Sequence, residues 1–493
     1  MEFDVEYDSG RGDEGGGSGD GLAQPERVSG RQTSRSGGYQ GEPIAALASG
    51  VGGAVAVVRV SGEKACDVAD SVWNGRRRLA DLPPRTLHLG GLCDGGEPID
   101  EGVLAVRFEG PASYTGEDVV EFHCHGGALV ARLALQAVVQ AGARPANAGE
   151  FTQRAFLNGC LDLTQAEAVN DLIRAQTHAA LHVANAQYSG ALAQTVEGLW
   201  ERCRTILAEL EVQLDFPEED ATPTADTHAL LEQLDRLREE LATVSASRLE
   251  GEVLREGVSV VIAGPPNAGK STLLNAILGR DRAIVSDIPG TTRDTLEELA
   301  HIREIPVRVT DTAGLRDAVE TVEALGVERS HSALRSAQIV LWLHDAGNPR
   351  DRPGAPEDLT RHARVIEVLN KADLCSAGAV AATIRSGEGT TPIPISASKG
   401  EGLDALYDAV EEAVWSVPHH SVPDIAVSER HAHLLDRARD EIEHARGALE
   451  EGLAEGAASA LRGALASLGR ITGREVTSED ILGDIFSKFC MGK

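Results

Sequence analysis

Aromatic residues are scarce in this chain, at 3% of 493 residues, so its cores must rest on alanine, valine, leucine and isoleucine. Its seven cysteines are scattered without a CxxC pair, which argues against a disulfide framework and against a zinc site. No apolar stretch of about 20 residues is free of charge, and no apolar segment opens the chain. We therefore expect neither a membrane span nor a secretory signal, and a cytoplasmic protein.

Lysine is also rare, since only six of the 46 basic residues are lysine, and the formal net charge is -31. An ordinary cytosolic protein and adaptation to a salt-rich cytoplasm both fit this charge, and a GC-rich genome alone could favour arginine. Because the overall field repels phosphate, any nucleic-acid contact must use a local basic patch. Arg76, Arg77 and Arg78 form one candidate patch, and the surface of a basic partner is another.

The length predicts about three domains. Residues 1–41 are rich in Gly, Ser and charged residues and predict a disordered extension. Residues 42–160 contain Val-rich runs and a helical pattern, which favour a small α+β domain. Residues 161–250 and 418–493 are helical in pattern, whereas strands alternate with helices over 251–417, as in a parallel α/β sheet. The pattern predicts an α/β domain inserted into a helical domain.

A phosphate-binding motif opens the predicted insert. A strand over 258–263 runs into the Walker A sequence Gly-Pro-Pro-Asn-Ala-Gly-Lys-Ser at 264–271, and a helix follows. Lys270 is expected to neutralise the β and γ phosphates and Ser271 to bind Mg²⁺. A chance glycine-rich turn is the alternative, and the three further motifs that follow weigh against it.

The further motifs are Asp-Thr-Ala-Gly from Asp311, Asn-Lys-Ala-Asp ending at Asp373 and Ser-Ala-Ser from Ser396, each at the end of a predicted strand. Asp373 can accept from both N1–H and the 2-amino group of guanine, which adenine does not offer. The segment 286–292 supplies Thr292 as a switch residue for Mg²⁺ and the γ phosphate. The predicted GTP-binding residues are Asn267, Ala268, Gly269, Lys270, Ser271, Thr272, Ser286, Asp287, Ile288, Pro289, Gly290, Thr291, Thr292, Asp311, Thr312, Ala313, Gly314, Asn370, Lys371, Asp373, Ser396, Ala397 and Ser398. We infer a Ras-like P-loop G domain.

Several motifs follow one another in a fixed order along the chain, the first named here in the nucleotide site and the others outside it. They are Gly-Thr-Thr-Arg-Asp at 290–294, Tyr-Thr-Gly-Glu-Asp at 114–118, the segments 149–158 and 161–168, and the terminal Phe-Cys-Met-Gly-Lys. With them, the chain from about residue 42 to its end resembles the tRNA modification GTPase family MnmE, also called TrmE. The resemblance implies a homodimer whose N-terminal domain, residues 42–160, binds folate and mediates dimerisation. The dimer would form a heterotetramer with the flavoprotein MnmG (GidA), which carries the FAD.

The resemblance implies modification of C5 of the wobble uridine, position 34, in tRNA to a (carboxymethyl)aminomethyl group. The one-carbon donor would be 5,10-methylene- or 5-formyl-tetrahydrofolate, and the nitrogen donor ammonium or glycine. Arg59, Glu121 and Lys493 match folate-binding positions, although Arg59 and Glu121 alone would be taken as solvated charges. Cys160 stands where the family has a folate-binding lysine, and residues 49–54 replace a longer glycine-rich loop.

Further roles carried over from the family concern catalysis. Cys490 matches the terminal cysteine implicated in modification; otherwise it would be taken as a small buried apolar residue. We expect the tail that carries it to meet the pocket of Arg59 and Glu121. Glu323 matches the glutamate that orients the attacking water through a second water, and its alternative is a solvated helix charge. Mg²⁺ would be held by Ser271 and Thr292, and K⁺ by Asn267, Ser286, Ile288 and Thr291.

Two other classes remain open at this point. A regulatory GTPase of the ribosome-assembly type, such as Era or Der, shares the nucleotide motifs but lacks this N-terminal domain and the Phe-Cys-Met-Gly-Lys end. A structural GTPase without further chemistry is the second, and Cys490 argues against it.

Overall fold

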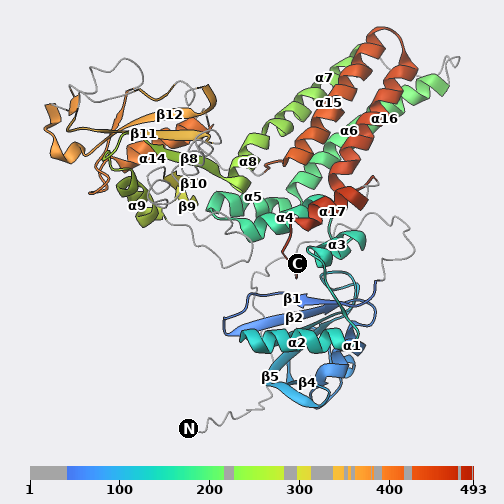
Figure 1. Ribbon diagram of the computed structural model, residues 1–493. Helices are drawn as coiled ribbons and strands as arrows, with labels where there is room; N and C mark the ends of the chain where they lie inside the picture. Colours follow the sequence, from blue (N-terminus) through green and yellow to red (C-terminus); the bar gives the residue numbers. More distant parts are fainter. Residues whose placement is uncertain are drawn as a thin grey trace, which may run out of the picture. The chain divides into compact units, whose positions relative to one another are not determined.

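The computed structural model describes residues 41–215, 227–281, 297–311, 337–348, 354–356, 361–378, 380–381, 391–415, 425–475, 479–490 and 492 (Figure 1). Apart from Gly41, the predicted N-terminal extension lies outside these ranges. Within the described ranges, no helix is both long enough and apolar enough to cross a membrane.

The first part of the described chain is a seven-stranded sheet with the strand order β3-β4-β5-β6-β2-β1-β7. Its strands are β1 (Ile44–Leu47), β2 (Val55–Ser61), β3 (Trp73–Asn74), β4 (His88–Asp94), β5 (Glu97–Phe108), β6 (Val119–His125) and β7 (Arg144–Pro145). Helices α1 (Ala65–Val72) and α2 (Ala128–Gln140) and the short 3₁₀ helix η1 (Leu79–Asp81) complete it.

Side chains alternate between the two faces of this sheet, as strand geometry requires. Val58, Val60 and Phe122 point to one face and form a core with α1 and α2. The residues between them point to the opposite face, where Arg59 on β2 lies opposite Glu121 on β6 in the strand register. The strand register therefore pairs the two residues that the sequence could only name separately.

Helix α3 (Glu150–Leu157) still belongs to the first part, because its Phe151 packs with Ile44 and Ala46 of β1. The helical part begins with α4 (Leu163–Arg174), α5 (His178–Tyr188), α6 (Ala191–Asp215), α7 (Thr227–Ala246) and α8 (Arg248–Glu256). It resumes later in the chain with α15 (Glu429–Glu450), α16 (Ala454–Thr472) and α17 (Glu479–Ser487). The long helices α6, α7, α15 and α16 run side by side around a core of leucine and alanine (Figure 1).

The sequence pattern over 166–186 carries no glycine or proline and reads as uninterrupted helix, but the structure breaks it. Helix α4 ends at Arg174, and α5 starts at His178. The hydroxyl of Thr177 accepts a hydrogen bond from the Ala180 N–H at 3.1 Å and so caps α5. A threonine cap inside a segment without glycine or proline is a weak signal, which explains the difference.

Between α8 and α15 lies a six-stranded sheet with the order β13-β12-β11-β8-β10-β9. Its strands are β8 (Val258–Ala263), β9 (Glu297–Ile302), β10 (Ile305–Asp311), β11 (Ile339–Asp345), β12 (Arg364–Asn370) and β13 (Ile393–Pro394). Helices α9 (Lys270–Asp281) and α14 (Leu403–Trp415) and the 3₁₀ helix η2 (Ala372–Leu374) accompany it. All neighbouring strands are parallel except β9. The predicted α/β domain inserted into a helical domain is confirmed.

Candidate functional site: a nucleotide site and a separate pocket

The loop between β8 and α9 is shaped by backbone conformations that favour glycine. Gly264 has φ of +144°, and a Cβ there would lie 2.4 Å from the Leu343 carbonyl oxygen. Gly269 has φ of +95°, and its Cβ would lie 2.3 Å from Asn370 Nδ2. Lys270 Nζ donates to the carbonyls of Gly264 at 3.2 Å and Pro265 at 3.1 Å. The loop thus turns tightly in front of the N-terminus of α9, an arrangement that binds phosphate.

Asn370 joins three of the predicted motifs. This buried residue ends β12, and its Nδ2 donates to the Ala268 carbonyl of the P-loop at 2.9 Å. Its Oδ1 accepts from the Ala397 N–H at 3.1 Å. Lys371 Nζ donates to the Asn267 carbonyl and to Asp345 Oδ2, each at 2.7 Å. The side chains of two adjacent residues therefore hold the P-loop against the segment 396–398.

Asp373 carries an acceptor without a partner. Its Oδ2 lies 3.4 Å from Lys399 Nζ, and a hydrogen bond from Ser396, together with Lys399, lowers the pKa of the carboxyl. Its Oδ1 is buried and has no hydrogen-bond partner among the described residues. An unpaired buried acceptor is costly unless a ligand pairs with it. An ionised carboxylate at this position fits the adjacent N–H donors of guanine, so the residues present fit GTP.

Part of the predicted nucleotide site lies outside the described residues. Asp311 ends β10 with its backbone beside Ile262 of β8, as expected from the shared sheet edge. Ser271 and Thr272 lie in the first turn of α9. The residues outside the described ranges are Ser286, Asp287, Ile288, Pro289, Gly290, Thr291, Thr292, Thr312, Ala313, Gly314, Glu323 and Lys493. The predicted Mg²⁺ and K⁺ sites and the role of Glu323 therefore stay predictions.

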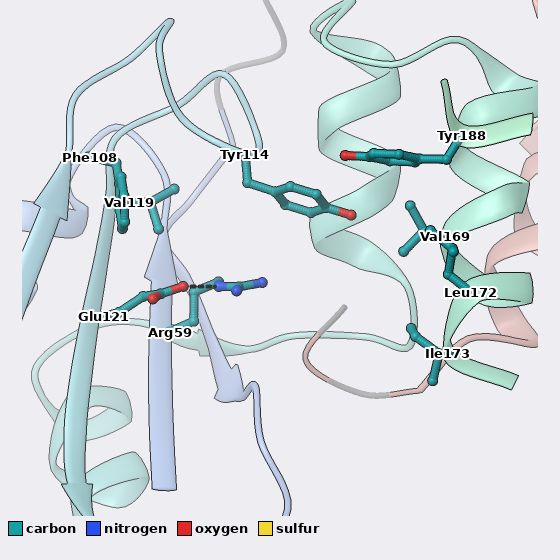
Figure 2. Close-up of a pocket in the computed structure, with 9 residues that line it drawn as sticks. All are labelled: Arg59, Phe108, Tyr114, Val119, Glu121, Val169, Leu172, Ile173 and Tyr188. Atoms are coloured by element: carbon teal, nitrogen blue, oxygen red, sulfur yellow. Dashed lines mark hydrogen bonds and ion pairs between the residues drawn. The ribbon is translucent and has the colours of Figure 1, made fainter. Parts of the chain in front are cut away.

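A second site lies on the sheet face that carries Arg59 and Glu121 (Figure 2). Arg59 Nε donates to Glu121 Oε1 at 2.7 Å, and the guanidinium carbon lies 5.6 Å from the ring centroids of Tyr114 and of Phe151. The pair opens into a cavity of about 440 Å³, a volume typical of small-molecule sites. The lining residues are Arg59, Phe108, Tyr114, Val119 and Glu121 from the sheet domain, and Val169, Leu172, Ile173 and Tyr188 from α4 and α5.

The end of the chain reaches this pocket. Phe486 of α17 and Phe489 pack with Leu163 of α4 in an apolar cluster, and Cys490 follows, half-buried. Arg59 NH1 lies 3.5 Å from the Gly492 carbonyl oxygen. The described part of the tail therefore contacts Arg59 through Gly492, and the roles of Cys490 and Lys493 stay predictions.

Cys160 lies elsewhere. It is exposed, and its Sγ lies 3.0 Å from the position that a Cβ on Gly116 would take. It is not among the described residues that line the cavity. Desolvation raises the pKa of its thiol, so the protonated form is favoured. Its proposed part in folate binding stays a prediction.

The sequence alone does not show that α4 and α5 form one wall of the pocket. Tyr114 belongs to the motif at 114–118, whereas Tyr188, Leu172 and Ile173 belong to none of the motifs. Helical periodicity says which residues share a face, but not that this face lines a cavity of another domain. In Figure 2 the rings of Tyr114 and Tyr188 extend toward each other from the two walls. The available signal in the sequence is the aromatic residue Tyr188, which follows the predicted helical run over 166–186.

The loop between β8 and α9 and the base-binding motifs at the same sheet edge define a P-loop GTPase. The family model described as the GTP-binding protein TrmE N-terminus matches residues 43–160, and the MnmE helical domain model matches residues 163–490. The tRNA modification GTPase MnmE of Chlorobaculum tepidum is 42% identical over 469 residues, covering 92% of this chain and 98% of the relative. That of Pseudomonas fluorescens is 45% identical over 462 residues, covering 92% and 99%.

The chain therefore belongs to the MnmE family of tRNA modification GTPases. Among solved structures, Era of Aquifex aeolicus bound to GDP and aluminium fluoride is 28% identical. It covers 38% of this chain and 67% of that one, with a TM-score of 0.25, and the family assignment does not depend on it.

Proposed function

We propose that this chain hydrolyses GTP and, as a homodimer with the flavoprotein MnmG (GidA), modifies C5 of the wobble uridine, position 34, in tRNA. The product carries a (carboxymethyl)aminomethyl group, a tetrahydrofolate supplies the one-carbon unit, and FAD belongs to the partner. The observation that carries the proposal is the convergence of the tail beyond Cys490 on the Arg59 pocket. The membership in the family supports it. We propose a cytoplasmic location for the complex.

The pocket fits a folate by its chemistry. A pterin ring presents adjacent N–H donors and flat aromatic faces, and the glutamate tail of a folate carries carboxylates. Glu121 offers an acceptor, Arg59 a fixed cation, and Tyr114 and Tyr188 offer aromatic surfaces. We propose that these residues, with Lys493, hold the folate, and that Cys490 supplies a thiol close to it.

GTP hydrolysis is proposed to follow the family pattern. Lys270 faces the β and γ phosphates, Ser271 and Thr292 hold Mg²⁺, and Asn267 with Ser286, Ile288 and Thr291 holds K⁺. The two cations supply charge neutralisation at the phosphates, and Glu323 orients the attacking water.

The rate of GTP hydrolysis should be higher in K⁺ than in Na⁺ at equal ionic strength. Glu323→Ala should lower this rate about 100-fold with GTP affinity nearly intact. Equal rates of GTP hydrolysis in both salts would contradict the proposed potassium site.

Mass spectrometry of wobble uridines in a deletion strain tests the proposal. We expect loss of the modified nucleoside and its return when the wild-type chain is supplied. Normal wobble uridines, combined with accumulation of immature ribosomal particles, would instead support the ribosome-assembly alternative. A return of modification in the absence of the flavoprotein would contradict the proposed partnership.

Cys490→Ser separates the chemistry of the tail from the GTPase. The variant should fold, dimerise and hydrolyse GTP almost normally, but its modification of tRNA with flavoprotein and folate should fall strongly. Cys93→Ser is the matched control, because the half-buried Cys93 thiol donates to the Val72 carbonyl and a hydroxyl can do the same. Full modification by the Cys490 variant would exclude the thiol from the reaction, and a parallel loss of GTPase activity would make the tail structural.

A further inference from the structure

Helix α5 joins the two sites of the molecule. Its last residue, Tyr188, lines the Arg59 pocket. Near its first residue, the Ala179 N–H donates at 3.2 Å to Glu304 Oε2, which lies in the turn between β9 and β10 of the G domain. The helix has 11 residues and so spans about 16 Å. A contact made by the G domain at one end therefore holds a helix whose other end forms part of the pocket.

The turn that carries Glu304 is placed between the two switch motifs. In the sequence, β9 follows the segment 286–292 by four residues, and β10 ends at Asp311, the first residue of the Asp-Thr-Ala-Gly motif. Strands β9 and β10 pair antiparallel from Ile302 and Ile305 outward. Each strand of the hairpin therefore connects Glu304 through the chain to one of the two motifs, β9 to the segment 286–292 and β10 to the Asp-Thr-Ala-Gly motif.

The contact between Glu304 and the N-terminus of α5 is suited to coupling the G domain to this helix. The carboxylate of Glu304 faces the N-terminus of α5, where an anion is favoured by the helix dipole. Glu304 is exposed, so the contact can be made and broken without exposing a core. Thr177 also caps α5, from within the helical domain, at the Ala180 N–H. The helix therefore keeps one cap when the G domain withdraws the other.

Packing extends the contact to the rest of the pocket wall. Ala179, Ala180 and Val183 of α5 form an apolar cluster with Leu254 of α8 and Ala426, the residues on either side of the insert. Helix α4, which supplies the remaining wall residues, is held separately. Arg255 of α8 lies 3.6 Å from Asp171 of α4 and also donates to the Ala426 carbonyl at 3.1 Å. The wall is thus anchored to α8, the helix that leads into the G domain, and contacts the turn between β9 and β10 at a second point.

We propose that Glu304 is a positioning residue that couples the nucleotide state of the G domain to ligand binding in the Arg59 pocket, acting through helix α5 and Tyr188. Because coupling between sites is reciprocal, folate in the pocket changes nucleotide affinity by the same factor as nucleotide changes folate affinity. The choice of folate as the ligand rests on the proposed function. The contact between Glu304 and α5 does not.

The test measures the affinity of 5-formyl-tetrahydrofolate for the full chain bound to GDP and bound to a non-hydrolysable GTP analogue. In the wild type we expect the two dissociation constants to differ by about fivefold or more, the lower end of common allosteric coupling. In Glu304→Ala the ratio should approach one, and Glu304→Gln, which keeps an acceptor oxygen, should retain part of it. Glu412→Ala, an exposed glutamate on α14, is the matched control and should keep the wild-type ratio.

A wild-type ratio of one, or an unchanged ratio in Glu304→Ala, would overturn the proposal. If 5-formyl-tetrahydrofolate binds in neither state, the proposed folate function fails, and hydrogen exchange decides the coupling alone. Exchange of the amides at 178–182 should then differ between the two nucleotide states in the wild type and not in Glu304→Ala. Identical exchange in both states of the wild type would exclude a route through α5.

Discussion

At the base-binding end of the nucleotide site, support of the loops and selectivity for the base belong to different side chains. Asn370 joins the P-loop to the segment 396–398, because its amide nitrogen and its amide oxygen each make a hydrogen bond to the protein backbone. Asp373 keeps one buried oxygen without a described partner. Selectivity for guanine is therefore expected to depend on Asp373, whereas loss of Asn370 would disturb the loops themselves.

Asp373→Asn should weaken GTP binding by roughly 10- to 100-fold, because an amide cannot accept from both guanine donors. Competition between GTP and other purine nucleoside triphosphates for the chain measures the loss of preference. Asp408→Asn is the control, since this exposed carboxylate pairs with Arg303 at the surface of the G domain. Unchanged guanine preference in Asp373→Asn would refute the assignment.

At the scale of single residues, the sequence predicted those residues that belong to motifs. The P-loop strand was expected over 258–263 and is β8, and the structure brings together the described members of four motifs. Tyr188 and Glu304 could not be predicted in the same way, because their roles depend on tertiary contacts between segments far apart in the chain. The pairing of Arg59 with Glu121 is intermediate: the family resemblance named both residues, but only the strand register places them opposite each other.

At the level of elements, the helical part is tied together by a partly buried cluster of Glu167, Arg430 and His431. Glu167 of α4 accepts from Arg430 Nε at 2.8 Å and lies 2.6 Å from His431 Nε2, both on the first turn of α15. Arg430 also donates to the Ile471 carbonyl near the end of α16 at 3.1 Å. The Ser428 N–H donates to His431 Nδ1, which requires that nitrogen to be unprotonated. Arg430 of α15 thus links the carboxylate on α4 to the end of α16.

This cluster should make the helical part sensitive to acid. Desolvation lowers the pKa of His431 below 6.5, and His431 and Arg430 lower the pKa of Glu167 below 4.5. In both cases the unfolded chain binds a proton that the folded chain does not, so stability falls as the pH falls. We expect the melting temperature to decrease from pH 7 to 5.5 through His431, and further below about pH 4.5 through Glu167.

His431→Gln should flatten the dependence of the melting temperature on pH between pH 7 and 5.5. The decrease below about pH 4.5 should remain. His433→Gln is the matched control, because His433 is exposed on the same helix. Melting curves followed by circular dichroism measure both variants. A wild-type slope that persists in His431→Gln would assign the effect to other groups.

The terminal segment also depends on a particular backbone conformation. Gly492 has φ of +93°, and a Cβ there would lie 2.0 Å from the Leu47 carbonyl oxygen of β1. Gly492→Ala should therefore release the tail from Arg59 and lower tRNA modification strongly, with GTP hydrolysis unchanged. Gly483→Ala in α17, where a Cβ meets nothing within 4 Å, is the control. Modification assays and limited proteolysis of the tail report the result, and a fully active Gly492→Ala would show that this docking is dispensable.

For the whole molecule, the formal net charge of -31 implies self-repulsion of the folded state. Added salt screens this repulsion, because the Debye length falls from about 10 Å at 0.1 M to about 3 Å at 1 M. The melting temperature of the nucleotide-free chain should rise by about 2 °C or more over this range. NaCl and KCl should act equally, which separates screening from binding of K⁺ at a site. Calorimetry measures the shift, and a flat or falling curve would contradict the expectation.

The insertion of the G domain also affects how the helical part can form during synthesis. Helix α7 packs mainly on α15 and α6 mainly on α16, whereas α6 and α7 touch each other little. The leucines Leu230, Leu234, Leu237 and Leu241 of α7 are buried only in the finished bundle. At a ribosomal rate of about 5–20 residues per second, the chain between Ala246 and Glu429 takes on the order of 10 to 40 s to emerge. For that interval the apolar face of α7 has no α15 to cover it, so these leucines stay accessible to water and to other apolar surfaces.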